Sequence, residues 1–412
     1  MQSKKSPVSG VGEAGQRGDD LRSDLYVQID LGKHDALNIE LSSKVAVYYE
    51  DAIRKQVVDV LGALSVTAAK VHIEDQGSLP FVIEARVIAA ALRAGVVATG
   101  KAGAERSAPL PKPSARKRLR RSRLYLPGNE PRFMVNAGLH GPDAIILDLE
   151  DSVHPNAKDA ARQLVASALR HVDYGASERM VRINQGELGL ADLEVIVTEL
   201  PDVILMPKVE QADEVLTVAA AIDCLHEKHK IDRPLFLMPI LESAAGIENA
   251  YAIATASPRV VALTIGLEDF TADLGVVKTK DGAETLWARS RLVNAARAAG
   301  VQAIDSVYGD IEDLEGLANW TLRSKAMGFV GMGCVHPRQI PVIHRGFAPT
   351  ASEIEKAQRI VTAFAEAKAR GVAVVNLGAK MIDPPVVERA VRLVEQAHAM
   401  GLIKESDRVS VN

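Results

Sequence analysis

Two hydrophobic patterns divide the chain into an early and a late part. In the early part, apolar and polar side chains alternate at 25–29 and 37–41, which is the period of half-buried β-strands. Between 45 and 64 the apolar residues recur every three or four positions, as on one face of a helix. A further strand is predicted at 71–73, and 81–95 is predicted as a strand that runs into a helix. Together these elements indicate a small α+β unit over residues 23–97.

In the late part, short and almost continuously apolar runs alternate with segments of helical period. Such runs are typical of parallel strands that are buried on both faces. Eight of them follow residue 121: RLYLP, AIILDLE, MVRIN, DVILMPK, LFLMPILES, VALTIGLED, VQAIDSV and GMGCVHP. No G-x-G-x-x-G or Walker A sequence follows any of these runs. The pattern therefore favours a (β/α)8 TIM barrel over residues 121–345 rather than a doubly wound sheet.

The remaining segments have compositions of their own. Residues 1–22 are rich in Gly, Ser and charge and are predicted to form a flexible tail. Residues 98–120 are rich in Ala, Pro and basic side chains and are predicted to link the two domains. Residues 346–412 form a C-terminal extension, which we expect to cover the barrel mouth as a lid or to reach a neighbouring subunit.

The overall composition narrows the function classes. With 25% charged and 47% hydrophobic residues and a net charge of −4, the chain has the composition of an ordinary globular protein, and a nucleic-acid partner is not expected. No charge-free apolar run approaches the length of about 18 residues that spans a bilayer, so no membrane partner is expected. Two cysteines, Cys224 and Cys334, are too few for a disulfide framework, which favours the cytoplasm.

Charged residues follow the predicted barrel strands, at the end where active sites of such barrels lie. They are Asp148, Glu150, Asp151, Arg182, Lys208, Glu242, Glu268, Asp269 and Asp305. Glu242 and Asp269 come from adjacent strands without a histidine or cysteine nearby, a set of oxygen donors that suits Mg²⁺. The alternative is an inert ion network in which both carboxylates pair with Arg182 and Lys208. Arg182 suits a clamp for a substrate carboxylate, and its alternative is a salt bridge to Asp148 or Glu150.

The late part resembles the β subunit of citrate lyase, within the malyl-CoA lyase-like and HpcH/HpaI aldolases. The stretches that carry the resemblance are RSRLYLPGNEPRF, AIILDLEDSV, RINQ, PKVE, PILESAAGI, IGLEDFTADLG, AIDSVYGD, HPRQIPVIHRGFAPT and GAKMIDPPVVERA. The resemblance implies that Glu242 and Asp269 bind Mg²⁺ and that Arg182 binds the carboxylated substrate. It also implies that Asp383 enters a neighbouring active site, in a homotrimer or a multiple of one.

This resemblance implies cleavage of a hydroxyacyl thioester into an oxo acid and an acyl thioester. A carboxylate must then exchange the protons, and Glu150 and Asp383 are both candidates. Lys208, Arg121 and Arg123 are further candidates for binding the substrate, the two arginines through the phosphates of a CoA-like group.

The early unit resembles the acyl carrier subunit of citrate lyase and, more distantly, the small carrier subunit of malonate decarboxylase. The matching stretches are SDLYVQI, NIELSSKV, IRKQVVDVLGALSV, VHIEDQGSL and IEARVIAA. That carrier family attaches phosphoribosyl-dephospho-CoA to a serine in a Ser-Gly-Asp sequence before the first strand. Here the sequence is Arg22-Ser23-Asp24. Alignment from Asp24 places Arg22 at the attachment position, whereas a shift of one residue would place Ser23 there.

Three hypotheses follow for the whole chain. The first is a fused carrier and lyase that cleaves a citryl-type thioester held on Ser23 into oxaloacetate and an acetyl thioester, with a citrate lyase α-like acyltransferase as a possible partner. The second is a free-standing lyase for malyl-CoA or citramalyl-CoA, whose early unit serves assembly only. The third is a scaffold in which the early unit is a docking module.

Overall fold

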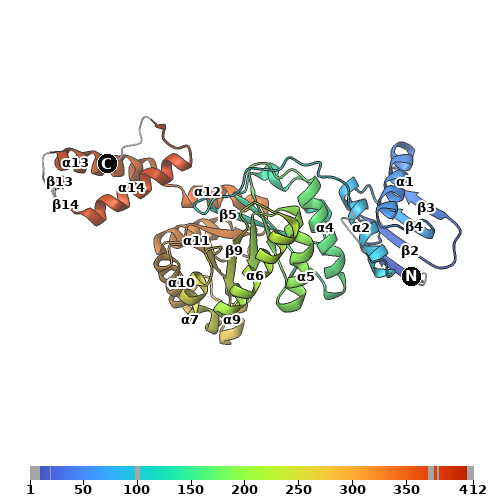
Figure 1. Ribbon diagram of the computed structural model, residues 1–412. Helices are drawn as coiled ribbons and strands as arrows, with labels where there is room; N and C mark the ends of the chain where they lie inside the picture. Colours follow the sequence, from blue (N-terminus) through green and yellow to red (C-terminus); the bar gives the residue numbers. More distant parts are fainter. Residues whose placement is uncertain (1–9, 19, 98–102, 370–374, 378–379, 406–412) are drawn as a thin grey trace. The chain divides into compact units, whose positions relative to one another are not determined.

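The computed structural model describes residues 10–18, 20–97, 103–369, 375–377 and 380–405. Compact packing divides the chain into two units, 1–340 and 341–412, and each is described by itself. Unit 1 contains a small N-terminal sheet domain and a closed barrel (Figure 1). No helix within the described ranges is long and apolar enough to cross a bilayer.

The N-terminal domain is a four-stranded sheet with two helices. Its strands lie in the order β1-β2-β4-β3, and only β3 and β4 are parallel. Its elements are β1 (Val11–Ala14), β2 (Leu25–Asp30), β3 (Leu37–Ser43), α1 (Ala46–Ala63), β4 (Ala69–Asp75) and α2 (Pro80–Arg93). The α+β architecture predicted from the alternating pattern is confirmed.

Two local predictions for this domain were wrong. The segment predicted as a flexible tail contains β1, whose buried positions are Gly12 and Ala14. Large side chains are excluded there, because a Cβ on Gly12 would lie 2.1 Å from the carbonyl oxygen of Ala90 in α2. The segment 81–95 begins as helix rather than strand, since Pro80 occupies its first turn, where proline is tolerated. Its apolar residues run almost continuously because the helix is buried on nearly all sides.

The barrel is closed by eight parallel strands in the described part of the chain, each paired with its neighbours in sequence order. They are β5 (Ser122–Pro127), β6 (Ala144–Asp148), β7 (Glu178–Arg182), β8 (Val203–Met206), β9 (Phe236–Leu241), β10 (Ala262–Ile265), β11 (Gln302–Asp305) and β12 (Gly331–Cys334). Between them lie α3 (Pro131–Met134), α4 (Lys158–His171), α5 (Gly186–Ile196), α6 (Ala212–His229), α7 (Ala244–Glu248), α8 (Ala250–Thr255), α9 (Leu267–Leu274), α10 (Leu286–Ala298) and α11 (Leu314–Met327). All eight predicted runs are strands, and the predicted TIM barrel is confirmed.

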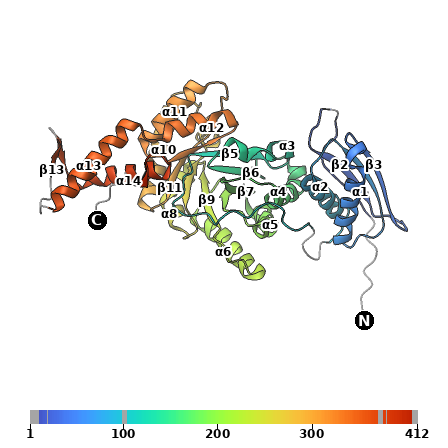
Figure 2. The same ribbon diagram turned by 90° about the horizontal axis from the view of Figure 1, so that it is seen from above.

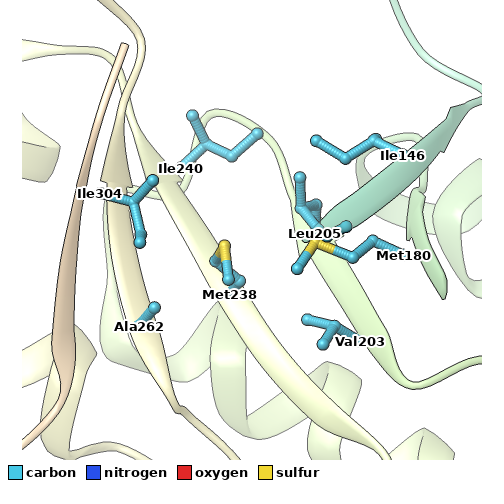
Figure 3. Packing of buried hydrophobic residues seen from close by; sticks show 9 residues of the cluster. Ile146, Met180, Val203, Leu205, Met238, Ile240, Ala262 and Ile304 are labelled. Carbon is cyan, nitrogen blue, oxygen red and sulfur yellow. The ribbon is translucent and has the colours of Figure 1, made fainter. Parts of the chain in front are cut away.

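Apolar side chains fill the barrel interior below the strand ends. Figure 3 shows Ile146, Met180, Leu205, Met238 and Ile304 converging from different strands, and all five are fully buried. Such layers of inward-facing residues make the barrel a packed core rather than a pore.

The N-terminal domain is held on the barrel by buried charges. Helix α2 packs beside α4 in both views (Figures 1 and 2). The Glu84 carboxylate in α2 accepts hydrogen bonds from Arg170 Nη1 at 2.8 Å and Ser167 Oγ at 3.0 Å, both in α4. Nearby, Arg86 pairs with Asp24 through two hydrogen bonds of 3.0 and 2.9 Å and donates to the carbonyl oxygen of Asn129, which follows β5. These contacts fix the domain in place rather than leaving it on a tether.

The segment between the two domains also packs against the barrel from residue 103 onward. Arg120 is fully buried and forms two 2.7 Å hydrogen bonds to Glu178 at the start of β7. Arg106 donates to the carbonyl oxygens of Leu169 and Glu199. The basic residues that indicated a solvated linker are thus anchors, because arginine can be buried when carboxylates and carbonyls satisfy its donors.

Unit 2 is a helical pair with a short hairpin. Its elements are α12 (Ile340–Phe347), which begins at the last residue of unit 1, α13 (Ala351–Ala369), β13 (Val375–Leu377), β14 (Lys380–Ile382) and α14 (Pro384–Ala399). Helices α13 and α14 pack through an apolar cluster that includes Val361, Val387 and Val394. The expectation that this extension acts as a lid stays a prediction.

We predict that replacing Glu84 by Ala destabilises unit 1 by about 3–5 kcal/mol, because the change leaves the buried Arg170 with fewer acceptors. The measurement is urea unfolding followed by circular dichroism. The matched control is Glu50→Ala, which removes a half-exposed pair with Arg54 on α1 and should cost less than about 0.5 kcal/mol. Equal losses in the two variants would show that the buried network does not hold the domain.

Candidate active site

Glu242 and Asp269 lie together at the carboxyl end of the barrel. Glu242 directly follows β9, and Asp269 lies in the first turn of α9, after the adjacent strand β10. Both side chains line two cavities. The side cavity, of about 630 Å³, lies among the segments that follow β7, β8 and β9 and includes Asn184, Leu190, Met206, Lys208 and Val218. The inner cavity, of about 470 Å³, includes Arg123, Tyr125, Asp148, Asp151, Arg182, Ile240, Thr264 and Ser306.

The Glu242 carboxylate is confined by its surroundings. It is buried, and its Oε1 atom accepts a hydrogen bond of 2.8 Å from the backbone N–H of Lys208. A Cβ at position 266 would lie 2.3 Å from its Oε2 atom, so a larger residue there would displace the carboxylate. Burial, together with the nearby negative charge of Asp269, raises the pKa of Glu242 to about 8. The electrostatic repulsion between these two carboxylates, and the burial of Glu242, destabilise their charged forms, and a bound cation would offset both effects.

These two residues fit a hard metal ion. Within the described ranges no group of three or more His, Cys, Asp or Glu side chains could hold a metal ion. A pair of carboxylates is nevertheless sufficient for Mg²⁺, which keeps several waters and completes its shell with substrate oxygens. For Glu242, the structure does not show the alternative of an inert ion pair with Lys208, since it is the backbone N–H of Lys208 and not the ammonium group that donates to the carboxylate.

Arg182 makes the salt bridge that the sequence left as its alternative role. Its Nε and Nη2 atoms donate to the two oxygens of Asp148 at 2.6 and 2.7 Å, and Nη1 lies 2.9 Å from Glu150 Oε2. Burial opposes the charge on Asp148, but the hydrogen bonds and charge of Arg182 hold its pKa below the ordinary value. Asp148 therefore fixes the orientation of Arg182 at the wall of the inner cavity, with Nη1 on the side of Glu150.

Glu150 lies between two cations. Its Oε1 atom is 2.8 Å from Lys208 Nζ, which also lies 3.2 Å from Asp151. Burial raises the pKa of Glu150 despite the opposing charge of Arg182. For Lys208, burial favours a lower pKa, but the hydrogen bonds and charges of Glu150 and Asp151 outweigh it and raise the pKa. A carboxyl with a raised pKa beside an ammonium group is chemically suited to exchange protons.

Two other carboxylates near the strand ends differ from this pair. Asp305 is fully buried against α10 and α11, where it binds Arg289, Trp320 and Ser324. Glu268, next to Asp269, is exposed and pairs with Lys278, and it also lines the inner cavity. Of these two residues, only Glu268 is a further carboxylate beside the Glu242–Asp269 pair.

The structure separates the two arginines that were predicted to bind phosphates. Arg121 lies before β5, at the amino end of the barrel, and pairs with Asp143 at 2.8 Å. Its position is therefore opposite to the strand ends that carry Glu242. Arg123 is only 1% exposed and points into the barrel, where it lines the inner cavity. The sequence contained a sign of this inward position, because Arg123 and Tyr125 are two residues apart and therefore lie on one face of an otherwise apolar strand.

Ser23, in the N-terminal domain, is not among the residues that line these cavities. Asp383 belongs to unit 2, where its side chain accepts a hydrogen bond from the backbone N–H of Val386 and caps α14. Ser23 has a φ of 60°, a left-handed conformation that glycine adopts most readily. Ser23 thus has the backbone shape expected of the glycine in a Ser-Gly-Asp sequence, which leaves Arg22 at the preceding position.

Residues 121–337 match the family described as HpcH/HpaI aldolase/citrate lyase, and residues 15–94 match that of the malonate decarboxylase delta subunit. The citrate lyase subunit beta of Leuconostoc mesenteroides subsp. cremoris is 40% identical over 291 residues, which are 69% of this chain and 96% of that protein. The mitochondrial citramalyl-CoA lyase of Rattus norvegicus is 34% identical over 290 residues, covering 68% of this chain and 86% of that protein.

A solved structure is similar as well. The protein CitE from Mycobacterium tuberculosis, in complex with magnesium, acetoacetate and coenzyme A, is 28% identical with a TM-score of 0.56. The similarity covers 69% of this chain and 100% of that one.

We predict that Glu242→Gln changes the pH dependence of stability in metal-free protein. Because the pKa of Glu242 is raised from 4.5 to about 8, the folded state holds this proton more tightly than the unfolded state. The native protein therefore loses folding stability as the pH rises from 4.5 to about 8, and the variant does not. At pH 8 the variant should be more stable by at least about 1 kcal/mol, and at pH 5 the difference should be small.

The measurement is urea unfolding in the presence of a chelator at both pH values. Glu194→Gln, an exposed carboxylate on α5 that pairs with Lys228, is the control and should follow the native profile. A Glu242→Gln variant with the native pH profile would contradict the prediction.

Proposed function

This chain belongs to the HpcH/HpaI aldolase/citrate lyase family and is a carbon–carbon lyase, and we propose that it cleaves a 3-hydroxy-3-carboxyacyl thioester with the help of Mg²⁺. The proposal rests chiefly on one observation, that Glu242 and Asp269 converge at the wall shared by the two cavities beside Arg182 and Lys208. Relatives named for citrate, citramalyl-CoA and malyl-CoA cleavage support the thioester chemistry.

The reaction converts the substrate into a 2-oxo acid and an acyl thioester. The hydroxyl group loses its proton, the bond between the hydroxylated carbon and the carbon next to the thioester carbonyl breaks, and the latter carbon keeps the electron pair. That carbon then takes up a proton, so that atoms and charge balance. Mg²⁺ held by Glu242 and Asp269 would polarise the oxygen that becomes the ketone.

The protein's own groups orient the substrate and move the proton. Arg182, which Asp148 holds from behind, positions the carboxylate next to the reacting carbon. Glu150 exchanges the proton, and the adjacent Lys208 keeps it oriented and stabilises its charged form. The side cavity, with Leu190, Met206 and Val218 in its wall, gives space to the acyl thioester.

Asp383 is the second candidate for the proton transfer and would act from a neighbouring copy of the chain. This role requires a homo-oligomer, such as a homotrimer.

The thioester reaches the site as a free CoA thioester rather than on Ser23. The left-handed backbone of Ser23 favours the alignment in which Arg22 replaces the modified serine, and arginine offers no hydroxyl for attachment. The domain is also anchored by buried ion pairs, which suits a fixed module better than a moving carrier. A citryl group tethered through phosphoribosyl-dephospho-CoA remains the second candidate, because residues 15–94 match a carrier-type family. Only that form would need an acyltransferase partner.

We predict that Asp269→Asn lowers kcat for Mg²⁺-dependent thioester cleavage by at least about 100-fold, because it removes one of two charged metal ligands. Release of the oxo acid, followed by reduction with a coupled dehydrogenase, measures the rate. Glu194→Gln is the control, since this exposed carboxylate on α5 pairs with Lys228 and lines neither cavity. Equal rates in the two variants would exclude Asp269 as a ligand.

We predict that intact mass spectrometry of the native protein, isolated from cells with a prosthetic-group transferase, shows the unmodified mass of the chain. The reason is that position 22 is arginine and Ser23 occupies a glycine-type position. An added mass that disappears in Ser23→Ala would establish the tethered form instead.

A further inference from the structure

Arg123 is a buried cation without a carboxylate partner. Among the described residues six arginines are buried, namely Arg86, Arg120, Arg123, Arg170, Arg179 and Arg289. Five of them form salt bridges with buried carboxylates. Arg123 forms none, which sets it apart because an unpaired buried charge is among the most costly groups in a protein interior.

The contacts of Arg123 are weak ones for a guanidinium. Nη1 lies 3.1 Å from the sulfur of Met238 and Nη2 donates to Thr264 Oγ1 at 2.8 Å, whereas Nε has no hydrogen-bond partner among the residues that the structure describes. Met238 belongs to the apolar cluster of the barrel interior (Figure 3). Burial in these surroundings lowers the pKa of Arg123, whereas a charged hydrogen-bond acceptor would restore it. The side chain therefore has unused donors and an electrostatic need for an anion.

The inner cavity connects this cation to the metal pair. Arg123 and Thr264 line the same cavity as Glu242, Asp269 and Arg182. Arg182 already binds Asp148 through two of its nitrogens, so it has room for one carboxylate at most. A substrate that carries a second carboxylate needs another cation, and in this cavity that cation is Arg123.

We propose that Arg123 binds the second carboxylate of the oxo-acid half of the substrate, so that the enzyme prefers thioesters that release a dicarboxylic oxo acid. This rests on the proposed lyase function and names its substrate class. Thr264 keeps the guanidinium oriented, and the free Nε and the weakly bonded Nη1 supply the donors. A citryl thioester, which releases oxaloacetate, fits this class, whereas citramalyl and malyl thioesters, which release pyruvate and glyoxylate, do not.

The kinetic test compares citryl-CoA with citramalyl-CoA in the full-length protein with Mg²⁺. The native enzyme should have the higher kcat/KM for citryl-CoA. Arg123→Met keeps an unbranched apolar stem but removes the charged guanidinium group, and it should lower the ratio of the two kcat/KM values by at least about 100-fold. Arg123→Lys should restore part of the ratio. Arg132→Met, half-exposed on α3, is the control and should leave the ratio at the native value.

A binding test keeps this inference separate from the lyase proposal. With Mg²⁺, calorimetry should show that Arg123→Met weakens oxaloacetate binding at least about 100-fold relative to pyruvate binding. Without ligand, Arg123→Met should unfold at a higher temperature than the native protein, because an unpaired buried charge is removed. A merely structural arginine would give the opposite shift.

The outcomes separate the two ideas. Absence of cleavage of every thioester by the native enzyme would overturn the lyase proposal, and the oxaloacetate titration would still decide the role of Arg123. Cleavage with an unchanged selectivity ratio in Arg123→Met would overturn the inference and leave the lyase proposal intact.

Discussion

Compensation of buried charge is the constraint on which this structure depends. Around the barrel, carboxylates and arginines are buried as pairs: Arg120 with Glu178 near its amino end, Arg289 with Asp305 behind β11, and Arg182 with Asp148 at its mouth. A low-dielectric interior tolerates such charges only when they are paired and hydrogen-bonded. Among the described residues that line the inner cavity, two groups depart from this pairing: the Glu242–Asp269 pair has excess negative charge and Arg123 has excess positive charge. These uncompensated charges are the places where we propose that a cation and an anion bind.

Much of the barrel, and the place of Glu242 and Asp269 in it, could be predicted from the sequence because the physical signals are local. Parallel strands buried on both faces produce continuous apolar runs, and the carboxyl end of such a run shows where Glu242 and Asp269 must lie. The strand β1 gave no such signal, since close packing against α2 requires Gly12 and Ala14 there instead of large apolar residues.

The roles of the arginines could not be predicted in the same way, because they depend on which partner lies across the fold. Arg121 and Arg123 are two residues apart, yet Arg121 pairs with Asp143 at the amino end of the barrel, whereas Arg123 donates to Met238 and Thr264 inside it. The basic residues before β5 were interpreted as a solvated linker because the sequence does not show which partners they meet in the fold. Their acceptors, such as Glu178 and the carbonyl oxygen of Leu169, lie far away in sequence.

The docking of the N-terminal domain has a consequence for assembly. The matching citrate lyase β subunit corresponds to 69% of this chain and is covered over 96% of its own length, so the N-terminal domain is additional to it. The fraction of separate subunits that is associated depends on their concentrations. A domain on the same chain, held by Glu84 and Arg170, is instead present at a constant effective concentration. The ratio of one domain to one barrel is therefore fixed at translation, and dilution in the cell cannot alter it.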